Sequence, residues 1–205
     1  ETSTMRRLIL ASSSPYRRAL LEKLRLPFES ASPHINEEGL PSESASELAA
    51  RLATEKARAL RDKFPDALII GSDQVAECQG RQLGKPGTAE KAVEQLMFCA
   101  GHAVTFHTGL CLMDSSNGSH TTVCEPFRVY FKNLSRAEAE RYVELDNPLD
   151  CAGSFKAESL GVALFEKMEG SDPNSLVGLP LIRLVELLQL EGITPLARKT
   201  PNSQA

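Results

Sequence analysis

Two runs of alternating residues, AVTFHTGLCLMD (103–114) and HTTVCEPFRVYFKN (120–133), lie in the middle of the chain. Their β-branched and aromatic content predicts strands, and Asn117-Gly118 between them is typical of a hairpin turn. Strand-like and helix-like segments alternate on both sides of this hairpin. An antiparallel hairpin within an alternating chain predicts an α/β fold with a mixed sheet.

Residues typical of helix N-termini mark the start of the helices before the hairpin. Ser14-Pro15 predicts the start of a helix, and Ser44 with Glu47 three residues later predicts a capping box and a second helix. The expected segments are a buried strand at 8–11, helices to about residues 24 and 63, a loop at 29–43, a strand at 67–76 with a polar end, and a loop at 84–87.

Similar signals follow on either side of the hairpin. Thr88 predicts a helix to residue 99, and Ser135 with Glu138 predicts a capping box and a helix to about residue 145. The other expected segments are a strand pair or strand-turn at 161–170, a polar loop at 171–180 in which Asp172 caps or positions the last helix, and a closing helix within 179–192. Residues 1–4 are interpreted as a tag remnant, 5–195 as one domain and 196–205 as a flexible tail.

Composition narrows the class of protein. The net charge of −4 argues against a partner that is a nucleic acid polymer. The cysteine count of five is odd, with no CxxC pair, which indicates reduced thiols in a cytoplasmic protein. The scattered histidines predict no zinc site, and no apolar run reaches the roughly 18 residues of a membrane span.

The junction after the first strand, LILASSSPYRR (8–18), carries three serines and two arginines. A helix N-terminus has free N–H groups and the positive end of the helix dipole. Ser12 and Ser14 would add hydroxyl donors there. Arg17 and Arg18 lie one turn further on and could fold back towards an anion. The junction predicts a phosphate site, and the alternative is an ordinary serine N-cap followed by two solvated arginines.

Three other charged residues stand out. Lys56 falls on the apolar stripe of its helix, so it needs a counter-charge or a ligand unless it only snorkels at the edge. Asp73 stands where an apolar strand stops, a place where a carboxylate can hold a metal or orient a water; the alternative is an ordinary turn. Glu37, in the loop at 29–43, could be a second carboxylate, although surface acids are common.

Further candidates carry weaker signals. Lys85 lies on a glycine-flanked loop that could approach a phosphate closely. Gln74 could read a base edge through a paired donor and acceptor. In the stretch CAGSFKAES, Phe155 offers a stacking surface, Lys156 a cation and Glu158 an acceptor. A purine with N–H donors would suit Glu158, and a positively charged base would suit it more.

The order of these motifs resembles the Maf family of nucleotide pyrophosphatases. LILASSSPYRR, INE, the helical Lys56, GSDQV, GKP, CAGSFKAE and DPNSLVGLPL follow in register over about residues 5–195. The resemblance implies a two-lobed α/β domain with a cleft over a mixed twisted sheet and flanking helices, related to inosine-triphosphate pyrophosphatases. It also implies hydrolysis of nucleoside triphosphates with a divalent cation, Mg²⁺ or Mn²⁺, and leaves a homodimer open.

Three positions match the subgroup that prefers 7-methyl-GTP. The subgroup acting on dTTP and UTP typically has Arg, Thr and Gln where this chain has Tyr16, Gln74 and Glu158. Tyr16 departs from the Trp expected there, but its ring can still stack on a cationic methylated base. A carboxylate can accept from N1–H and the N2 amine of guanine, and the charge of the methylated base favours Glu158 further. Asn36 stands where the family often has Asp.

The resemblance also implies a mechanism, an in-line attack of water on the α-phosphate that clears modified nucleotides. Asp73 would be the general base, and Glu37 with Asp73 would hold the metal. The residues expected to bind the phosphates are Ser12, Ser14, Arg17, Arg18, Lys56, Lys85 and Lys156, and the five cations among them would neutralise the phosphate charge together with the metal. Three alternatives stay open: the same chemistry on dTTP, UTP or another modified nucleotide; a nucleotide-binding regulator of cell division without catalysis; and a nucleotidyl-sugar transferase, for which neither GxGxxG nor a paired DxD is present.

Overall fold

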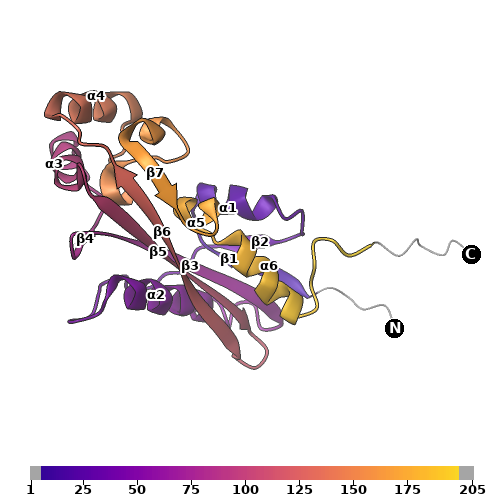
Figure 1. Ribbon diagram of the computed structural model, residues 1–205. Coiled ribbons are helices and arrows are strands. Elements are labelled where there is room, and N and C mark those ends of the chain that lie inside the picture. The colour runs from indigo at the N-terminus through magenta and orange to yellow at the C-terminus, as the bar shows by residue number, and fades with distance from the viewer. Residues whose placement is uncertain (1–5, 199–205) are drawn as a thin grey trace, which may run out of the picture.

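The computed structural model describes residues 6–198 and shows one mixed, seven-stranded sheet with helices on both faces (Figure 1), which confirms the expected α/β class. The strands are β1 (Arg7–Ala11), β2 (Glu29–Ala31), β3 (Ala67–Cys78), β4 (Arg81–Leu83), β5 (Ala103–Asp114), β6 (His120–Phe131) and β7 (Phe165–Glu169). The helices are α1 (Pro15–Glu22), α2 (Ala45–Ala59), α3 (Ala89–Cys99), α4 (Arg136–Asp146), α5 (Pro173–Val177) and α6 (Leu181–Leu190), with 3-10 turns η1 (Ala152–Ser154) and η2 (Leu160–Leu164). The predicted tag remnant and most of the predicted tail lie outside the described residues.

The strand order leaves a gap on one edge of β3. The order is β2-β1-β3-β5-β6-β7, with β4 also paired to β3. β1 runs parallel to β3 and pairs with it as far as Gly71, whereas β4 pairs with β3 only from Ala76 onwards. Within residues 6–198, no strand covers that edge at residues 72–75, while β5 pairs with the other edge throughout. The free edge separates the two lobes.

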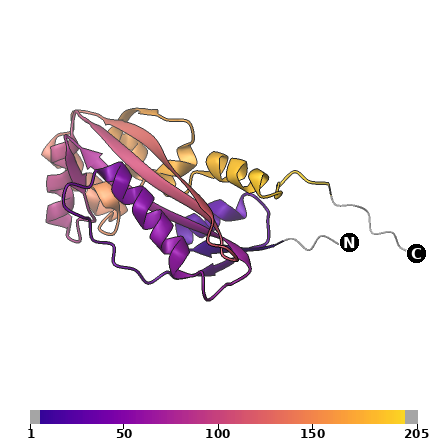
Figure 2. The same cartoon turned by 90° about the horizontal axis from the view of Figure 1, so that it is seen from below.

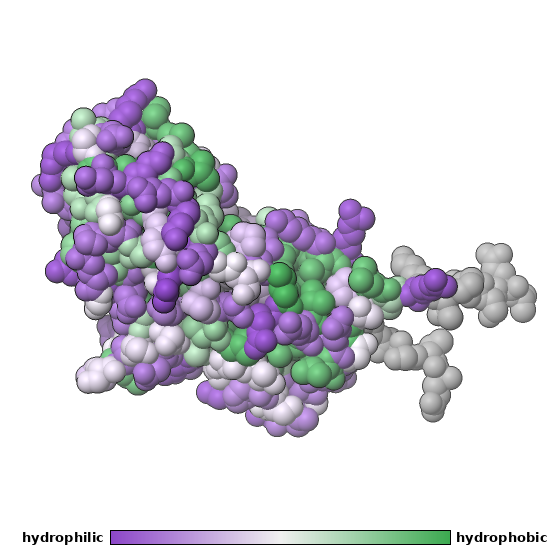
Figure 3. Space-filling view, viewed as in Figure 1, coloured by the Kyte–Doolittle hydropathy of each residue, from purple (hydrophilic) through white to green (hydrophobic). Residues whose placement is uncertain are grey.

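The long strands β3, β5 and β6 contribute to separate hydrophobic clusters in the two lobes. In the first lobe, Ile70 packs with α1 and α6 on one face of the sheet, and Ile69 packs with α2 on the other (Figures 1 and 2). In the second lobe, Ala76, Phe106 and Val129 pack with α3 and α4. Figure 3 shows this second lobe projecting from the rest of the molecule, with many hydrophilic residues on the face in view.

Two glycines let α2 lie directly on the sheet. A Cβ added at Gly71 would be 1.9 Å from the carbonyl oxygen of Ala53, and one added at Gly109 would be 2.2 Å from that of Ala49. Real Cβ atoms do not approach backbone so closely, so any side chain here would push the helix away. The close seating brings Lys56 of α2 against β3.

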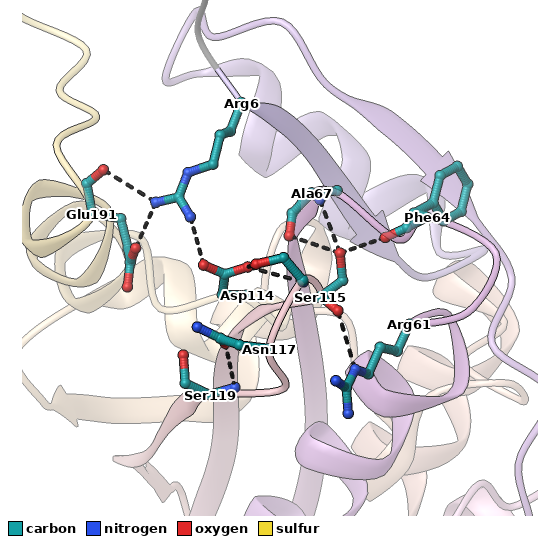
Figure 4. Close-up of polar contacts among 10 residues, drawn as sticks. Arg6, Arg61, Phe64, Ala67, Asp114, Ser115, Asn117, Ser119 and Glu191 are labelled. Carbon is teal, nitrogen blue, oxygen red and sulfur yellow. Dashed lines mark hydrogen bonds and ion pairs between the residues drawn. The ribbon is translucent and has the colours of Figure 1, made fainter.

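The end of the sheet far from the free edge is fixed by polar contacts (Figure 4). Arg6 donates to Asp114 at the end of β5 at 2.7 Å and to the side chain of Glu191 after α6 at 2.6 Å. Ser115 donates to the carbonyl of Phe64 and accepts from the backbone N–H of Ala67 at 2.9 Å. These contacts join the start of β1, the β5–β6 turn and the end of α6.

Most expected elements are confirmed, and the differences have physical reasons. The strand expected at 67–76 extends to Cys78, so Asp73 lies within the strand and not at its end. Pairing with β5 continues along β3 as far as Cys78 and keeps these residues extended. The expected loop at 29–43 begins with β2, a three-residue strand formed by pairing with β1. Of the expected strand at 161–170, only 165–169 is extended, and residues 160–164 form η2.

Two further observations bear on composition. The five cysteines, all within the described part of the chain, form no disulfide. None of the helices between residues 6 and 198 has the length and apolar content that a membrane crossing requires.

Candidate active site

A cleft of about 980 Å³ opens beside the free edge of β3. It lies between the α1 and α2 side of the molecule and the lobe with η1 and η2, so its walls come from distant parts of the sequence. The predicted site residues that line it are Ser12, Ser14, Tyr16, Arg17, Glu37, Lys56, Asp73, Gln74, Lys85 and Glu158. The fold therefore brings together most of the residues selected from the sequence.

Lys56 lies between two carboxylates in this cleft. Its Nζ is 2.8 Å from Oδ1 of Asp73 and 2.7 Å from Oε1 of Glu37. The side chains of Lys56 and Asp73 are each 11% exposed, whereas Glu37 is 60% exposed. The predicted counter-charge of Lys56 is thus Asp73, with Glu37 at the mouth. Each carboxylate uses one oxygen on the ammonium, and among the described residues the second oxygen has no hydrogen bond.

The two carboxyls have pKa shifts in opposite directions. Burial raises the pKa of Asp73 above its usual range, although the Lys56 ammonium works against that shift. The hydrogen bond from Lys56 lowers the pKa of Glu37. A buried carboxyl with a raised pKa can accept a proton, while its partner stays ionised at neutral pH. The pair could therefore supply one proton acceptor, Asp73, and one carboxylate that stays negatively charged, Glu37.

The junction after β1 is both an N-cap and part of the cleft wall. Ser14 accepts from the backbone N–H of Arg17 at 3.3 Å, and Ser12 accepts from that of Ser14 at 3.0 Å. The guanidinium of Arg17 donates through Nε to the carbonyl of Gly178 at 2.8 Å, which fixes its direction. Burial lowers the pKa of Arg17, but a guanidinium remains charged in proteins. The N-cap and the anion-site interpretations are therefore compatible.

Gln74 is held from behind by the segment after Asp172. Its amide nitrogen donates to the carbonyls of Ser175 at 2.9 Å and Leu176 at 3.0 Å. Since a carbonyl can only accept, the nitrogen must face α5. The expectation of a paired donor and acceptor at Gln74 is corrected: only the acceptor oxygen remains for a ligand.

Glu158 and Tyr16, which with Gln74 are the predicted base-recognition residues, are exposed side chains in the wall of the cleft. Tyr16 is 44% exposed on α1, and Glu158 lies on an exposed turn between η1 and η2.

Two other residues line the cleft nearby in the sequence, Cys151 and Phe155. Burial, followed by the negative charges of Asp150 and Glu158, raises the pKa of Cys151 to about 11, so this thiol is protonated at neutral pH. Phe155 touches the cleft but is only 5% exposed and packs edge-on against other phenylalanines, so it is a core residue rather than the expected stacking surface.

Arg18 and Lys156 are the two predicted phosphate ligands that do not line the cleft. Arg18 is exposed on α1 and pairs with Glu22 at 3.5 Å. Lys156 contributes its backbone N–H to a hydrogen bond with Tyr142. Their contacts with phosphate stay predictions.

Sequence reasoning missed the contacts that orient the site. Besides Arg17, the carbonyl of Gly178 accepts from Ser72 at 2.8 Å. Asp172 is 2% exposed and accepts from the backbone N–H group of Ile182, so it holds the start of α6 as the sequence predicted. It also accepts from the backbone N–H group of Asn174 and so caps α5, a helix that the sequence analysis did not predict. Asp172-Pro173 is an N-cap followed by Pro at the first helical position, a signal that could have revealed α5.

The family can be decided by comparison with known proteins. A family model described as "Maf-like protein" matches residues 7–191. The chain belongs to this Maf-like family. A protein of Pseudomonas aeruginosa named 7-methyl-GTP pyrophosphatase is 58% identical over 186 residues, which cover 91% of this chain and 97% of that one. A protein of the same name from Pseudomonas savastanoi pv. phaseolicola is 57% identical over 187 residues, with the same coverage.

Solved structures place this Maf-like chain in a wider fold group. A HAM1 protein from Coxiella burnetii aligns with a TM-score of 0.51 at 16% identity and covers 91% of this chain and all of that chain. The Ham1 protein of Staphylococcus aureus gives the same TM-score at 13% identity, covering 91% of this chain and 98% of that chain. At such identity the likeness concerns the fold alone, and it agrees with the two-lobed α/β architecture.

Proposed function

We propose that the protein is a nucleoside triphosphate pyrophosphatase that hydrolyses 7-methyl-GTP to 7-methyl-GMP and diphosphate, and so clears modified nucleotides in the cytoplasm. The observation that carries this proposal is one cleft lined both by Lys56, Asp73 and Glu37, which meet there and form the proposed phosphate end, and by Glu158, which belongs to the proposed base end. The two near-full-length relatives with that name support the choice of substrate.

The base end of the cleft offers acceptors. Gln74 can present only its carbonyl oxygen, and Glu158 presents an exposed carboxylate. Guanine carries donors at N1 and N2, so two acceptors suit it, and the positive charge of the N7-methylated base strengthens its attraction to Glu158. The ring of Tyr16 can stack on the same cationic base. Thymine and uracil offer one ring N–H between two carbonyls and match this set less well.

The phosphate end supplies charge and a base. Arg17, Lys56 and Lys85 line the cleft there and would neutralise the triphosphate. Asp73 would take a proton from a water molecule as the water oxygen attacks the α-phosphorus. The bond from that phosphorus to the bridging oxygen breaks, and diphosphate leaves. Burial favours this role, because the raised pKa of Asp73 makes it a better proton acceptor than an exposed aspartate.

A divalent cation fits the donor set. No cluster of three metal-ligand side chains occurs within residues 6–198, and Mg²⁺ is usually held by one or two carboxylates together with substrate phosphates. The second oxygens of Glu37 and Asp73 have no hydrogen bond and are hard donors of the kind that Mg²⁺ or Mn²⁺ prefers. When bound, such an ion would neutralise charge that develops on the phosphates.

The test is diphosphate release from 7-methyl-GTP, GTP, dTTP, UTP, CTP and ITP, each with Mg²⁺ or Mn²⁺. The proposal expects the highest kcat/KM for 7-methyl-GTP. A preference for dTTP or UTP would overturn the base assignment while keeping the reaction class. No turnover of any nucleotide, with retained binding, would favour the regulator that acts without catalysis.

A further inference from the structure

The turn that carries Glu158 has little regular structure of its own. It lies between η1 and η2, and the preceding residues Gly153 and Ser154 both have positive φ values, 81° and 65°. Glu158 is exposed and belongs to no strand or helix. A side chain that reads a base must be held in place, so contacts from elsewhere must position this turn.

The turn is tight within itself. The backbone N–H groups of Ser159 and Gly161 both donate to the carbonyl of Lys156, at 3.2 and 3.0 Å. A Cβ at Gly161 would be 2.3 Å from the same oxygen, so only glycine fits there. Residues 156–161 therefore form one compact unit, and its placement depends on how its ends are attached.

Two residues of this unit, Lys156 and Ser159, are attached to α4. The hydroxyl of Tyr142 accepts from the backbone N–H of Lys156 at 2.8 Å and donates to Oδ2 of Asp146 at 2.9 Å. The other oxygen of Asp146 accepts from the hydroxyl of Ser159 at 2.7 Å. Tyr142 and Asp146 are four residues apart, one helical turn, so their side chains are neighbours on α4. Glu158 lies between the two attachment points.

The network is separate from the cleft. Neither Tyr142 nor Asp146 lines it, and Tyr142 is only 3% exposed. Burial raises the pKa of Tyr142, so its hydroxyl keeps the proton that it donates to Asp146. The helix itself is anchored by the Ser135–Glu138 capping box and packs against α3. The network thus connects an anchored helix to an irregular turn.

We propose that Tyr142 and Asp146 are positioning residues for base recognition, which hold Lys156 and Ser159 so that the carboxylate of Glu158 faces the guanine edge. This inference rests on the proposed function and adds to it the residues that maintain its specificity. Lys56 and Asp73 lie on α2 and β3, outside this network. Because Lys156 does not line the cleft, loosening the turn should weaken guanine binding and leave the chemistry at Lys56 and Asp73 intact.

The test compares Tyr142→Phe and Ser159→Ala with the wild-type protein in steady-state kinetics with 7-methyl-GTP and UTP. Each variant removes one attachment and keeps most of the side chain. The kcat/KM ratio of 7-methyl-GTP to UTP should fall about tenfold, the effect of losing one hydrogen bond to a charged group. The fall should come from KM for 7-methyl-GTP, with kcat unchanged. Ser159→Thr, which keeps the hydroxyl, should retain the ratio.

The matched control is Tyr130→Phe, which removes a tyrosine hydroxyl from an exposed contact with Glu169 on the second lobe. It should leave the ratio unchanged. An unchanged ratio in folded Tyr142→Phe and Ser159→Ala would overturn the positioning role, and so would an equal loss of kcat/KM for both nucleotides. Because Ser159 is exposed, Ser159→Ala decides the matter even if Tyr142→Phe does not fold. A wild-type protein without preference for 7-methyl-GTP would overturn the proposed function itself.

Discussion

The two ends of the cleft are built in different ways. At the phosphate end, Lys56 and Asp73 come from a long helix and a long strand and are almost fully buried. At the base end, Tyr16 and Glu158 are exposed, and Glu158 depends on hydrogen bonds from another helix. The charges of Lys56 and Asp73 act with little water around them, whereas the base end can change without disturbing the core. Substitutions at the phosphate end should affect every substrate, and those at the base end should change the preference among substrates.

The largest effect is expected for Asp73→Asn, which keeps the shape of the side chain and removes the proton acceptor. Turnover of every nucleotide should fall by about 10²–10⁴-fold, the usual contribution of a general base. Diphosphate release under saturating substrate measures this. Full retention of activity would exclude Asp73 as the base and would contradict the catalytic role proposed for the phosphate end.

Lys56→Met should lower the free energy of unfolding by about 3 kcal/mol at pH 7, because it leaves the carboxyl of Asp73 buried without its partner. Burial raises the folded-state pKa of Asp73, so its ionisation opposes folding as the pH rises through that value. The deficit should therefore be larger at pH 7 than at about pH 3, where Asp73 is protonated in both states. Urea unfolding at the two pH values tests this.

The control for Lys56→Met is Lys167→Met, which removes a lysine from an exposed pair with Glu169 at 3.9 Å. Its effect should stay within about 0.5 kcal/mol at both pH values. Equal deficits in the two variants would show that the buried position of Lys56 has no special importance.

Gly71→Ala tests whether the close packing of α2 on the sheet is needed for stability and activity. The new methyl group would meet the carbonyl of Ala53, so the helix must shift, at a cost of about 1–3 kcal/mol of stability. Since α2 carries Lys56, kcat should fall for all nucleotides together. Gly84→Ala is the matched control for stability, not for activity: nothing lies within 4 Å of its added Cβ and its φ is not positive, but Gly84 lines the cleft. Similar melting temperatures for the two variants would contradict the close approach.

Glu158→Gln should act at the other end. It replaces a carboxylate with one acceptor and one donor, so the preference for 7-methyl-GTP over UTP should fall about tenfold, within the range of one bidentate contact to a base. Stability should not change, because the residue is exposed. If kcat/KM fell equally for both nucleotides, the division of the cleft into two ends would be wrong.

Arg18→Ala is expected to have the smallest effect. Arg18 is exposed and its ion pair with Glu22 joins neighbouring turns of α1, so activity should change less than about twofold. A loss of tenfold or more would mean that Arg18 turns into the cleft when substrate binds, and the phosphate role expected from the sequence would be supported.

Much of the fold is predictable from local signals. The caps Thr88 and Ser135 begin α3 and α4 where expected, and the ends of β5 are those of the alternating run. Local signals could not reveal β2 or β4, since three-residue strands form by pairing with a distant partner. For the same reason Asp73 was expected at a strand end, although pairing with β5 carries the strand past it.

The residues of the candidate site also divide into those that the sequence could predict and those that depend on distant contacts. Lys56 could be predicted because a lysine on an apolar stripe breaks the helical pattern, and the structure gives it the expected counter-charge. The orientation of Gln74 and the attachment of Glu158 could not, because they depend on carbonyls of Ser175 and Leu176 and on a tyrosine of α4, far away in the chain. Sequence patterns identified chemical groups, while long-range hydrogen bonds decide which of their atoms face the ligand.

The three long strands have a mechanical consequence. Hinges that close over ligands are usually a few residues of a loop or at the end of an element. Here β3, β5 and β6 cross from one lobe to the other as a continuous hydrogen-bonded ladder, and each belongs to the hydrophobic clusters of both. A change of angle between the lobes must therefore twist the sheet itself. We expect the cleft to be stiff and nearly preformed, with induced fit confined to its rim.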